Sequence, residues 1–133
     1  MKIIMRSEEN LEFRQFNESG FDIESLAPEF HYSALQMFAT SLAMCTYSVL
    51  FAYAEQVKTS ANSLVISVNW TYAKDSARVN NINMNIQWPA LPSSRLNAAQ
   101  RAASLCTLHQ TLENPPHIVT KVENVTKESE TES

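Results

Sequence analysis

Glycine is almost missing from this chain of 133 residues, because Gly20 is the only one. Globular proteins use about 7% glycine, the residue that most easily adopts the left-handed backbone of tight turns. Such turns must therefore be rare here, or be made by Asn and Asp. Cysteine is also scarce, since Cys45 and Cys106 are the only two. A structural metal site usually needs four clustered ligands, so we predict no metal and no cofactor.

Positive charge is neither abundant nor clustered. Ten Lys and Arg residues are scattered among fourteen Asp and Glu, which gives a net charge of −4. A nucleic-acid surface needs clustered basic side chains that contact phosphates, so we expect no nucleic-acid partner. The N-terminal residues contain too short an apolar run for a secretory signal. We therefore expect a cytoplasmic protein in which both thiols are reduced.

A run of 21 residues from Ala34 to Ala54 has no charged side chain, and about 20 apolar residues can cross a membrane. The run contains polar residues, however, and neither flank carries the Lys and Arg excess that fixes the orientation of a membrane helix. We therefore expect no membrane contact. The run predicts a helix from Ser33 to about Lys58 that is enclosed within a domain or a dimer.

Strand-like segments flank this helix on both sides, with period-two alternation or β-branched content. They are residues 2–7, 11–17, 21–25, 64–74 and 79–88, and a last short strand is predicted at 117–122. Ser93 or Ser94 is expected to cap a second helix that runs to about Glu113. The element order predicts an α+β fold in one domain, residues 1–122, followed by a disordered polar tail, residues 123–133.

The two segments that contain the cysteines carry a resemblance to a known family. The first is SALQMFATSLAMC, residues 33–45, and the second is CTLHQTL, residues 106–112, followed by IVTKV at 118–122. Together with the order of elements between them, these segments resemble the OsmC/Ohr proteins, thiol-dependent peroxidases of organic hydroperoxides and their relatives. The resemblance covers nearly the whole chain. It implies antiparallel sheets wrapped around long central helices in an intertwined homodimer, with active sites at the interface.

The resemblance also implies roles for three residues. Cys45 would be the peroxidatic thiolate that attacks an organic hydroperoxide and becomes a sulfenic acid. Cys106 would resolve the sulfenic acid as a disulfide, which an external dithiol would reduce. The thiolate needs a lowered pKa, and in the peroxidases an N-terminal arginine helps to activate the thiol. We therefore assign Arg6 to the catalytic site, with Arg14 as the other candidate.

One part of the family pattern is missing from this chain. The peroxidases hold the arginine with a glutamate at the start of the long helix. An ungapped match from Cys45 places Leu35 at that position, with Gln36 beside it. Pro28 and Glu29 resemble the missing pair, but Glu29 lies 16 residues before Cys45 and fits only with an insertion.

Three functions remain open: a thiol peroxidase, a non-catalytic relative that binds a small apolar ligand or a partner, and a redox sensor whose disulfide changes its packing. Cys45 also has a purely structural interpretation as a small buried side chain, and Arg6 has one as a solvated charge. His109 follows Cys106 by one helical turn, and we leave it out of the predicted site. We favour the enzyme, because both cysteines stand at the matching positions.

Overall fold

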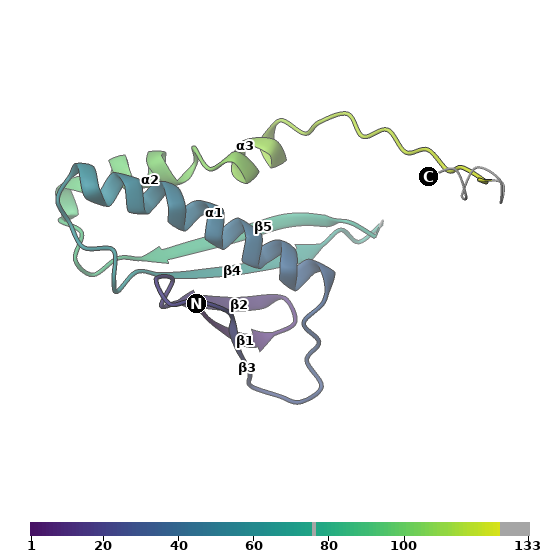
Figure 1. Cartoon of the computed structure of the whole chain (residues 1–133), viewed down its shortest axis with the longest axis horizontal. Coiled ribbons are helices and arrows are strands. Elements are labelled where there is room, and N and C mark those ends of the chain that lie inside the picture. Colours follow the sequence, from purple (N-terminus) through teal and green to yellow (C-terminus); the bar gives the residue numbers. More distant parts are fainter. Residues whose placement is uncertain (76, 126–133) are drawn as a thin grey trace.

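A computed structural model of the chain describes residues 1–75 and 77–125, which form one sheet with helices on one of its faces (Figure 1). The elements are β1 (Lys2–Ser7), β2 (Asn10–Arg14), β3 (Asp22–Ser25), α1 (Ala34–Gln56), β4 (Val65–Tyr72), β5 (Val79–Gln87), the 3-10 helix η1 (Ser93–Arg95), α2 (Leu96–Ala103) and α3 (Thr107–Glu113). The predicted α+β class, the first five strands and the long helix are confirmed. The predicted tail at 123–133 lies outside the described residues from residue 126 onward.

The five strands form one sheet in the order β3-β1-β2-β4-β5. All neighbours are antiparallel except β1 and β3, which run parallel, so the sheet is mixed rather than purely antiparallel as expected. The reason lies in the loop after β2, which carries the chain back to the start of β1. There the N-terminal ammonium of Met1 donates to the carbonyls of Glu18 and Gly20, both at 2.8 Å. Gly20 has a φ of 76°, the conformation that glycine adopts without strain.

The two faces of the sheet differ in polarity, because successive side chains of a strand point to opposite faces. The face toward the helices is almost fully buried and consists mainly of Ile3, Met5, Leu11, Phe13, Ile66, Val68 and Trp70. The opposite face carries polar side chains, including a cross-strand hydrogen bond of 3.2 Å from Asn83 to Asn69. This alternation is typical of a sheet with one face in the core.

Helix α1 lies across the apolar face of the sheet and begins with a polar cap. The Gln36 side chain accepts the Ser33 N–H at 2.9 Å and donates to the Glu8 carbonyl at 2.7 Å, which ties the helix start to the β1–β2 turn. By length and composition α1 would also pass as a membrane span, a test that the core helix of a soluble protein passes equally. One side of α1 is buried, and the other exposes Met37, Met44 and Phe51, spaced seven residues apart on one stripe.

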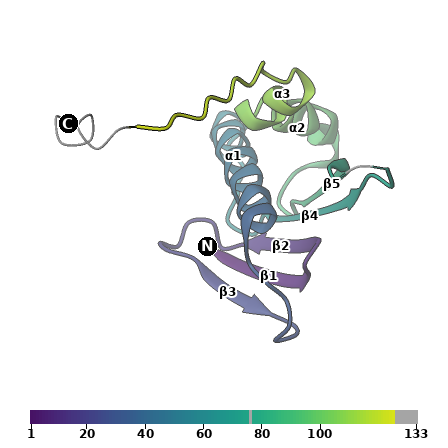
Figure 2. The same cartoon turned by 90° about the vertical axis from the view of Figure 1, so that its right-hand side faces the viewer.

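The second predicted helix is interrupted, which corrects the expectation of one helix to Glu113. Helix α2 ends at Ala103, and α3 starts at Thr107 with Cys106 as its N-cap in an extended conformation, φ −55° and ψ 134°. Both short helices lie beside α1 on the same side of the sheet (Figure 2). No Gly or Pro breaks the segment. The break follows instead from burial of the Cys106 side chain against α1, a tertiary contact that overrides local helix propensity.

The residues after α3 leave the folded unit as an extended arm (Figure 1). Ile118, Val119 and Val122 are 80%, 81% and 92% exposed. The strand predicted at 117–122 has no strand partner among residues 1–75 and 77–125. The arm therefore presents an apolar segment outside the core.

Candidate active site

The site is built where α1 meets the start of α3. Cys45 lies near the middle of α1 and is partly buried, and Cys106 at the N-cap of α3 is 0% exposed. The two thiols lie close enough for each to shift the pKa of the other. Two cysteines that are 61 positions apart in the sequence thus become direct neighbours. Their contact depends on the break between α2 and α3.

The surroundings of Cys45 favour its thiolate. Burial raises the pKa of Cys45, but three hydrogen bonds together outweigh burial and lower the pKa below its usual value. The donors are the Cys106 thiol and the backbone N–H groups of Leu108 and Thr107. Hydrogen bonds to the charged form of a group stabilise that form. The first turn of α3 therefore lowers the pKa of Cys45 through uncharged backbone N–H groups.

The surroundings of Cys106 favour its protonated thiol. Burial raises the pKa of Cys106, and its hydrogen bond to Cys45 raises it further. The N–H groups of His109 and Leu108 act in the opposite direction, but burial and the Cys45 contact prevail. Two neighbouring groups whose pKa values are pushed apart take different roles. The lower pKa of Cys45 makes it the more readily ionised of the two thiols.

Arg6 does not take the activating position predicted for it within one chain. Its Nη2 donates to the Glu12 carboxylate at 2.8 Å, and Arg14 donates to the other oxygen of the same carboxylate. Glu12 lies between Leu11 and Phe13, which are both buried under the helices, so its own side chain points to the opposite face of the sheet. Both arginines are therefore held on the face of the sheet that points away from α1.

The start of α1 holds Leu35 and Gln36 where the resemblance predicts a glutamate. Leu35 is partly buried against the core and borders a small void next to Val68 and Trp70, with a volume of about 10 Å³. Gln36 is 4% exposed and is used entirely in the cap of α1. Neither of these two positions therefore offers a carboxylate to an arginine, and the Glu8 carboxylate near the start of α1 is bound to His31.

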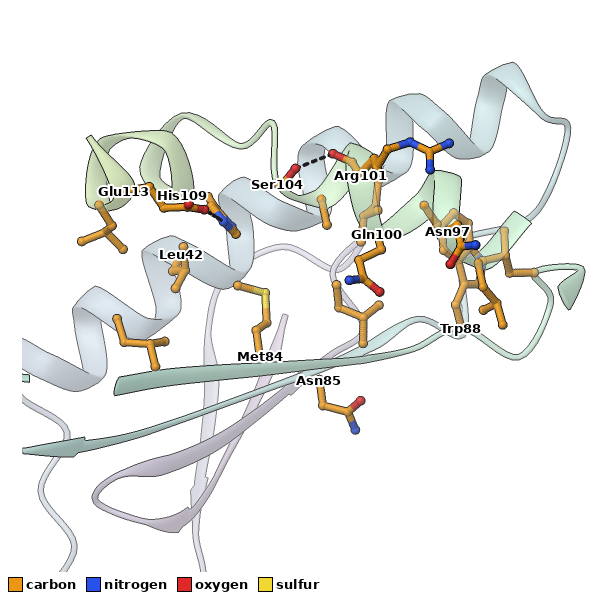
Figure 3. A pocket seen from close by; sticks show the side chains of 18 residues that line it. Leu42, Met84, Asn85, Trp88, Asn97, Gln100, Arg101, Ser104, His109 and Glu113 are labelled. Atoms are coloured by element: carbon orange, nitrogen blue, oxygen red, sulfur yellow. Dashed lines mark hydrogen bonds and ion pairs between the residues drawn. The ribbon is translucent and has the colours of Figure 1, made fainter. Parts of the chain in front are cut away.

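A groove of about 1030 Å³ runs between β5 and the helices, and its lining includes neither Cys45 nor Cys106 (Figure 3). Its apolar wall includes Ile82, Met84, Ile86, Trp88, Leu91 and Leu96. Polar side chains of α2 and α3 form the opposite side, among them Gln100, Arg101 and His109. Leu42, one helical turn before Cys45, also lines the groove. The groove is large enough for a small organic molecule, and it borders the elements that carry both sulfurs.

The sequence did not indicate two features of this site. The donors Thr107 and Leu108 act through their backbone, which leaves no signature in side-chain type. The break that orients these donors had only a weak signal, since Ser104 and Thr107 are residue types that favour helix ends over helix interiors. His109, left out of the predicted site, forms an ion pair with Glu113 on the wall of the groove.

Comparison with known proteins gives one match. The sequence profile of the OsmC-like protein family matches residues 27–121, which include both cysteines and every helix of the described structure. Neither a curated protein nor a solved structure gives a significant match.

Proposed function

The chain belongs to the OsmC-like protein family, and on that premise we propose that it is a thiol peroxidase that reduces organic hydroperoxides. The observation that carries the proposal is that Cys45 of α1 and Cys106 at the start of α3 are neighbours, and that the pKa of Cys45 is lowered while that of Cys106 is raised. A nucleophile and a resolving thiol need this difference in protonation.

Cys45 performs the first step. Its thiolate attacks the terminal oxygen of the hydroperoxide, so that an S–O bond forms and the O–O bond breaks. The leaving alkoxide takes up a proton and departs as an alcohol, and Cys45 is left as a sulfenic acid. The Cys106 thiol and the backbone N–H groups of Leu108 and Thr107 lower the pKa of Cys45, which favours its thiolate before the attack.

Cys106 performs the second step. Its sulfur attacks the sulfenic acid, a disulfide forms between Cys45 and Cys106, and the hydroxyl group leaves as water. An external dithiol then reduces the disulfide by thiol–disulfide exchange and is itself oxidised to a disulfide. The direct contact of the two thiols in the reduced protein supports this step, because little movement is needed to join them.

The preference for organic over inorganic peroxide rests on the groove. Its apolar wall along β5 adjoins α1 and α3, so an alkyl or aryl group of a substrate gains apolar burial that hydrogen peroxide cannot gain. On the same two helices, Leu42 belongs to the apolar core and Leu108 packs against it.

A homodimer is part of the proposal. The exposed stripe of Met37, Met44 and Phe51 gives α1 an apolar surface for a second copy. The extended arm at 117–122 exposes Ile118, Val119 and Val122, and β5 is an edge strand of the described sheet. Pairing of the arm with a strand of a second copy would produce the intertwined dimer of the family. Light scattering of the full chain and of a chain ending at Asn114 tests this, with a dimer expected for the first and monomer for the second.

The function is tested by adding a small excess of cumene hydroperoxide to the reduced protein and following free thiols and intact mass. We expect rapid loss of two thiols and of about 2 Da. Cys106→Ser should retain the oxidised Cys45 as a sulfenic acid, and Cys45→Ser should not react. Thiols that survive for hours would overturn the peroxidase proposal.

The arrangement of the arginines favours a second candidate, a redox sensor. Arg6 and Arg14 are bound to Glu12 away from the thiols, so neither of these two arginines assists the attack within one chain. A sensor would form the same disulfide slowly and without sustained turnover. Repeated cycles of cumene hydroperoxide consumption in the presence of a dithiol distinguish the enzyme from the sensor.

A further inference from the structure

The edge strand β5 lacks the usual protection against pairing with another strand. It is nine residues long, is the last strand of the described sheet, and contains no charged residue and no proline. Natural sheets protect their edges with short strands, charges or prolines. The opposite edge follows this rule, because β3 has four residues and exposes Asp22 and Glu24 (Figure 2). Of the two edges, β5 is therefore the one that can accept a further strand.

The wall that β5 gives to the groove is only partly covered. Its side chains Ile82, Met84 and Ile86 line the groove on the helix side of the sheet, and they are only partly buried. The side chains of Asn81 and Asn83 alternate with them on the opposite face. A strand that pairs with β5 would extend both faces, so it needs apolar side chains toward the groove and polar side chains on the other face.

The extended arm has the alternation that such a strand needs. Ile118 and Val122 belong to one side of an extended chain, and that side carries no charge. Val119 belongs to the other side together with Lys121 and Glu123. The ion pair of Lys121 and Glu123, at 2.6 Å, is consistent with two side chains on the same side of the arm. The uncharged side of the arm therefore matches the groove face of β5, and the charged side matches the polar face.

The arm points away from the β5 strand of its own chain. It leaves the end of α3 and runs outward from the folded unit (Figure 1). Asn114 is followed by Pro115 and Pro116. A residue before proline favours an extended backbone, and consecutive prolines favour the stiff polyproline conformation, so the chain is not set to turn back here. In a two-fold dimer, each copy can give one arm and receive one.

We propose that the arm of a second copy pairs with the β5 edge, and that Ile118 and Val122 of that arm complete the wall of the groove. This inference rests on the proposed function, in which the groove holds the organic part of the substrate. The two side chains narrow the groove and give it a further apolar surface. The organic group that one subunit accepts then depends on Ile118 and Val122 of the other subunit, which makes them specificity-determining residues.

Matched substitutions on the two sides of the arm test the pairing. Ile118 and Val119 are 80% and 81% exposed in the single chain, so Ile118→Asp and Val119→Asp should differ only if the arm is paired. Wild type and Val119→Asp should be dimers by light scattering, and hydrogen exchange should be slow at the β5 amides that β4 leaves unpaired. Ile118→Asp should lose this protection, because the apolar wall cannot hold an unpaired charge. Equal protection in both variants would overturn the proposal, and so would a monomer with protected β5 amides, in which the arm pairs within one chain.

Binding of 2-phenyl-2-propanol, the alcohol formed from cumene hydroperoxide, tests the wall without using the thiols. Calorimetry should show about tenfold weaker binding to Ile118→Ala than to wild type, the usual cost of a lost apolar contact in a pocket. Val119→Ala should bind as wild type does, and equal binding to both variants would overturn the role of Ile118. If wild type shows this contrast but does not reduce cumene hydroperoxide, the peroxidase proposal fails and the wall stands. If cumene hydroperoxide is reduced but Ile118→Ala binds the alcohol as wild type does, the wall fails and the peroxidase proposal stands.

Discussion

Two acidic side chains of this molecule, Glu12 and Cys45, have lowered pKa values although both are partly or fully buried. On the outer face of the sheet, the Glu12 carboxylate accepts hydrogen bonds from Arg6 and Arg14. Between α1 and α3, the Cys45 sulfur accepts from a thiol and two backbone N–H groups. In both places donors lower the pKa of an acid in spite of burial, which raises it. The first cluster uses full charges, and the second uses dipoles.

The difference shows that this fold lowers the pKa of two buried acids by different means. An arginine and a glutamate are present and paired, but on the face of the sheet that points away from the thiols. The reactive thiol is stabilised instead by the start of a seven-residue helix. We infer that the charged cluster serves stability and the thiol centre serves reactivity, so that substitutions in each should affect only one of the two properties.

The largest effect is expected for Glu12→Gln. The carboxylate is 7% exposed and accepts hydrogen bonds from two arginines. Hydrogen bonds to charged groups contribute about 2 kcal/mol, so the melting temperature should fall by roughly 8 °C for a chain of this size. Glu24→Gln, which removes the exposed ion pair with Lys2, is the control and should change little. The rate at which Cys45 reacts with dithiobis(nitrobenzoate) should be the same in Glu12→Gln as in wild type. A slower reaction would contradict the separation of the two clusters.

The same residue gives a pH dependence with a definite sign. Burial alone would raise the pKa of Glu12, but the hydrogen bonds from Arg6 and Arg14 lower it below the usual 4.5. The folded protein therefore binds this proton less readily than the unfolded chain. Its contribution to the free energy of unfolding is present above pH 4.5 and is lost as the pH falls through the folded value. Thermal unfolding between neutral and acid pH should show this loss in wild type, and the loss should be smaller in Glu12→Gln.

A smaller effect is expected when the thiol donor to Cys45 is removed. Cys106→Ala deletes the hydrogen bond that most lowers the pKa of Cys45, whereas Cys106→Ser keeps a donor of similar size. The pKa of Cys45 should rise in Cys106→Ala, so that less thiolate is present at neutral pH and alkylation by iodoacetamide slows by about tenfold. In Cys106→Ser, Cys45 should be alkylated at nearly the wild-type rate. Arg6→Gln should leave the rate unchanged, and a large effect there would place Arg6 in the site after all.

The sequence predicted those parts of the fold that depend on period and composition. The alternation in β5 and the uncharged run in α1 gave these elements within two residues at each end. The same alternation in β1 places the side chains of Met5 and Arg6 on opposite faces of the sheet. Because Met5 is apolar and belongs in the core, Arg6 is expected on the face that points away from the helices. The assignment of Arg6 therefore followed the family pattern against a local signal. The break before Cys106 had only a weak signal in the propensities of Ser104 and Thr107, because it depends on the packing of the buried Cys106 side chain.

The smallest expected effect tests the backbone part of the activation. Thr107 is the first residue of α3, where proline is well tolerated, and the extended conformation of Cys106, with ψ 134°, suits a residue that precedes proline. Thr107→Pro removes one N–H donor to Cys45 and no side-chain contact of the sulfur. The alkylation rate of Cys45 at neutral pH should fall about threefold, and Thr107→Ala, which keeps the N–H, should react as wild type does. Equal rates in both variants, with an unchanged melting temperature, would mean that Leu108 and Cys106 alone set the reactivity of Cys45. In that case two donors, and not three, would lower the pKa of Cys45, against the two arginines that lower the pKa of Glu12.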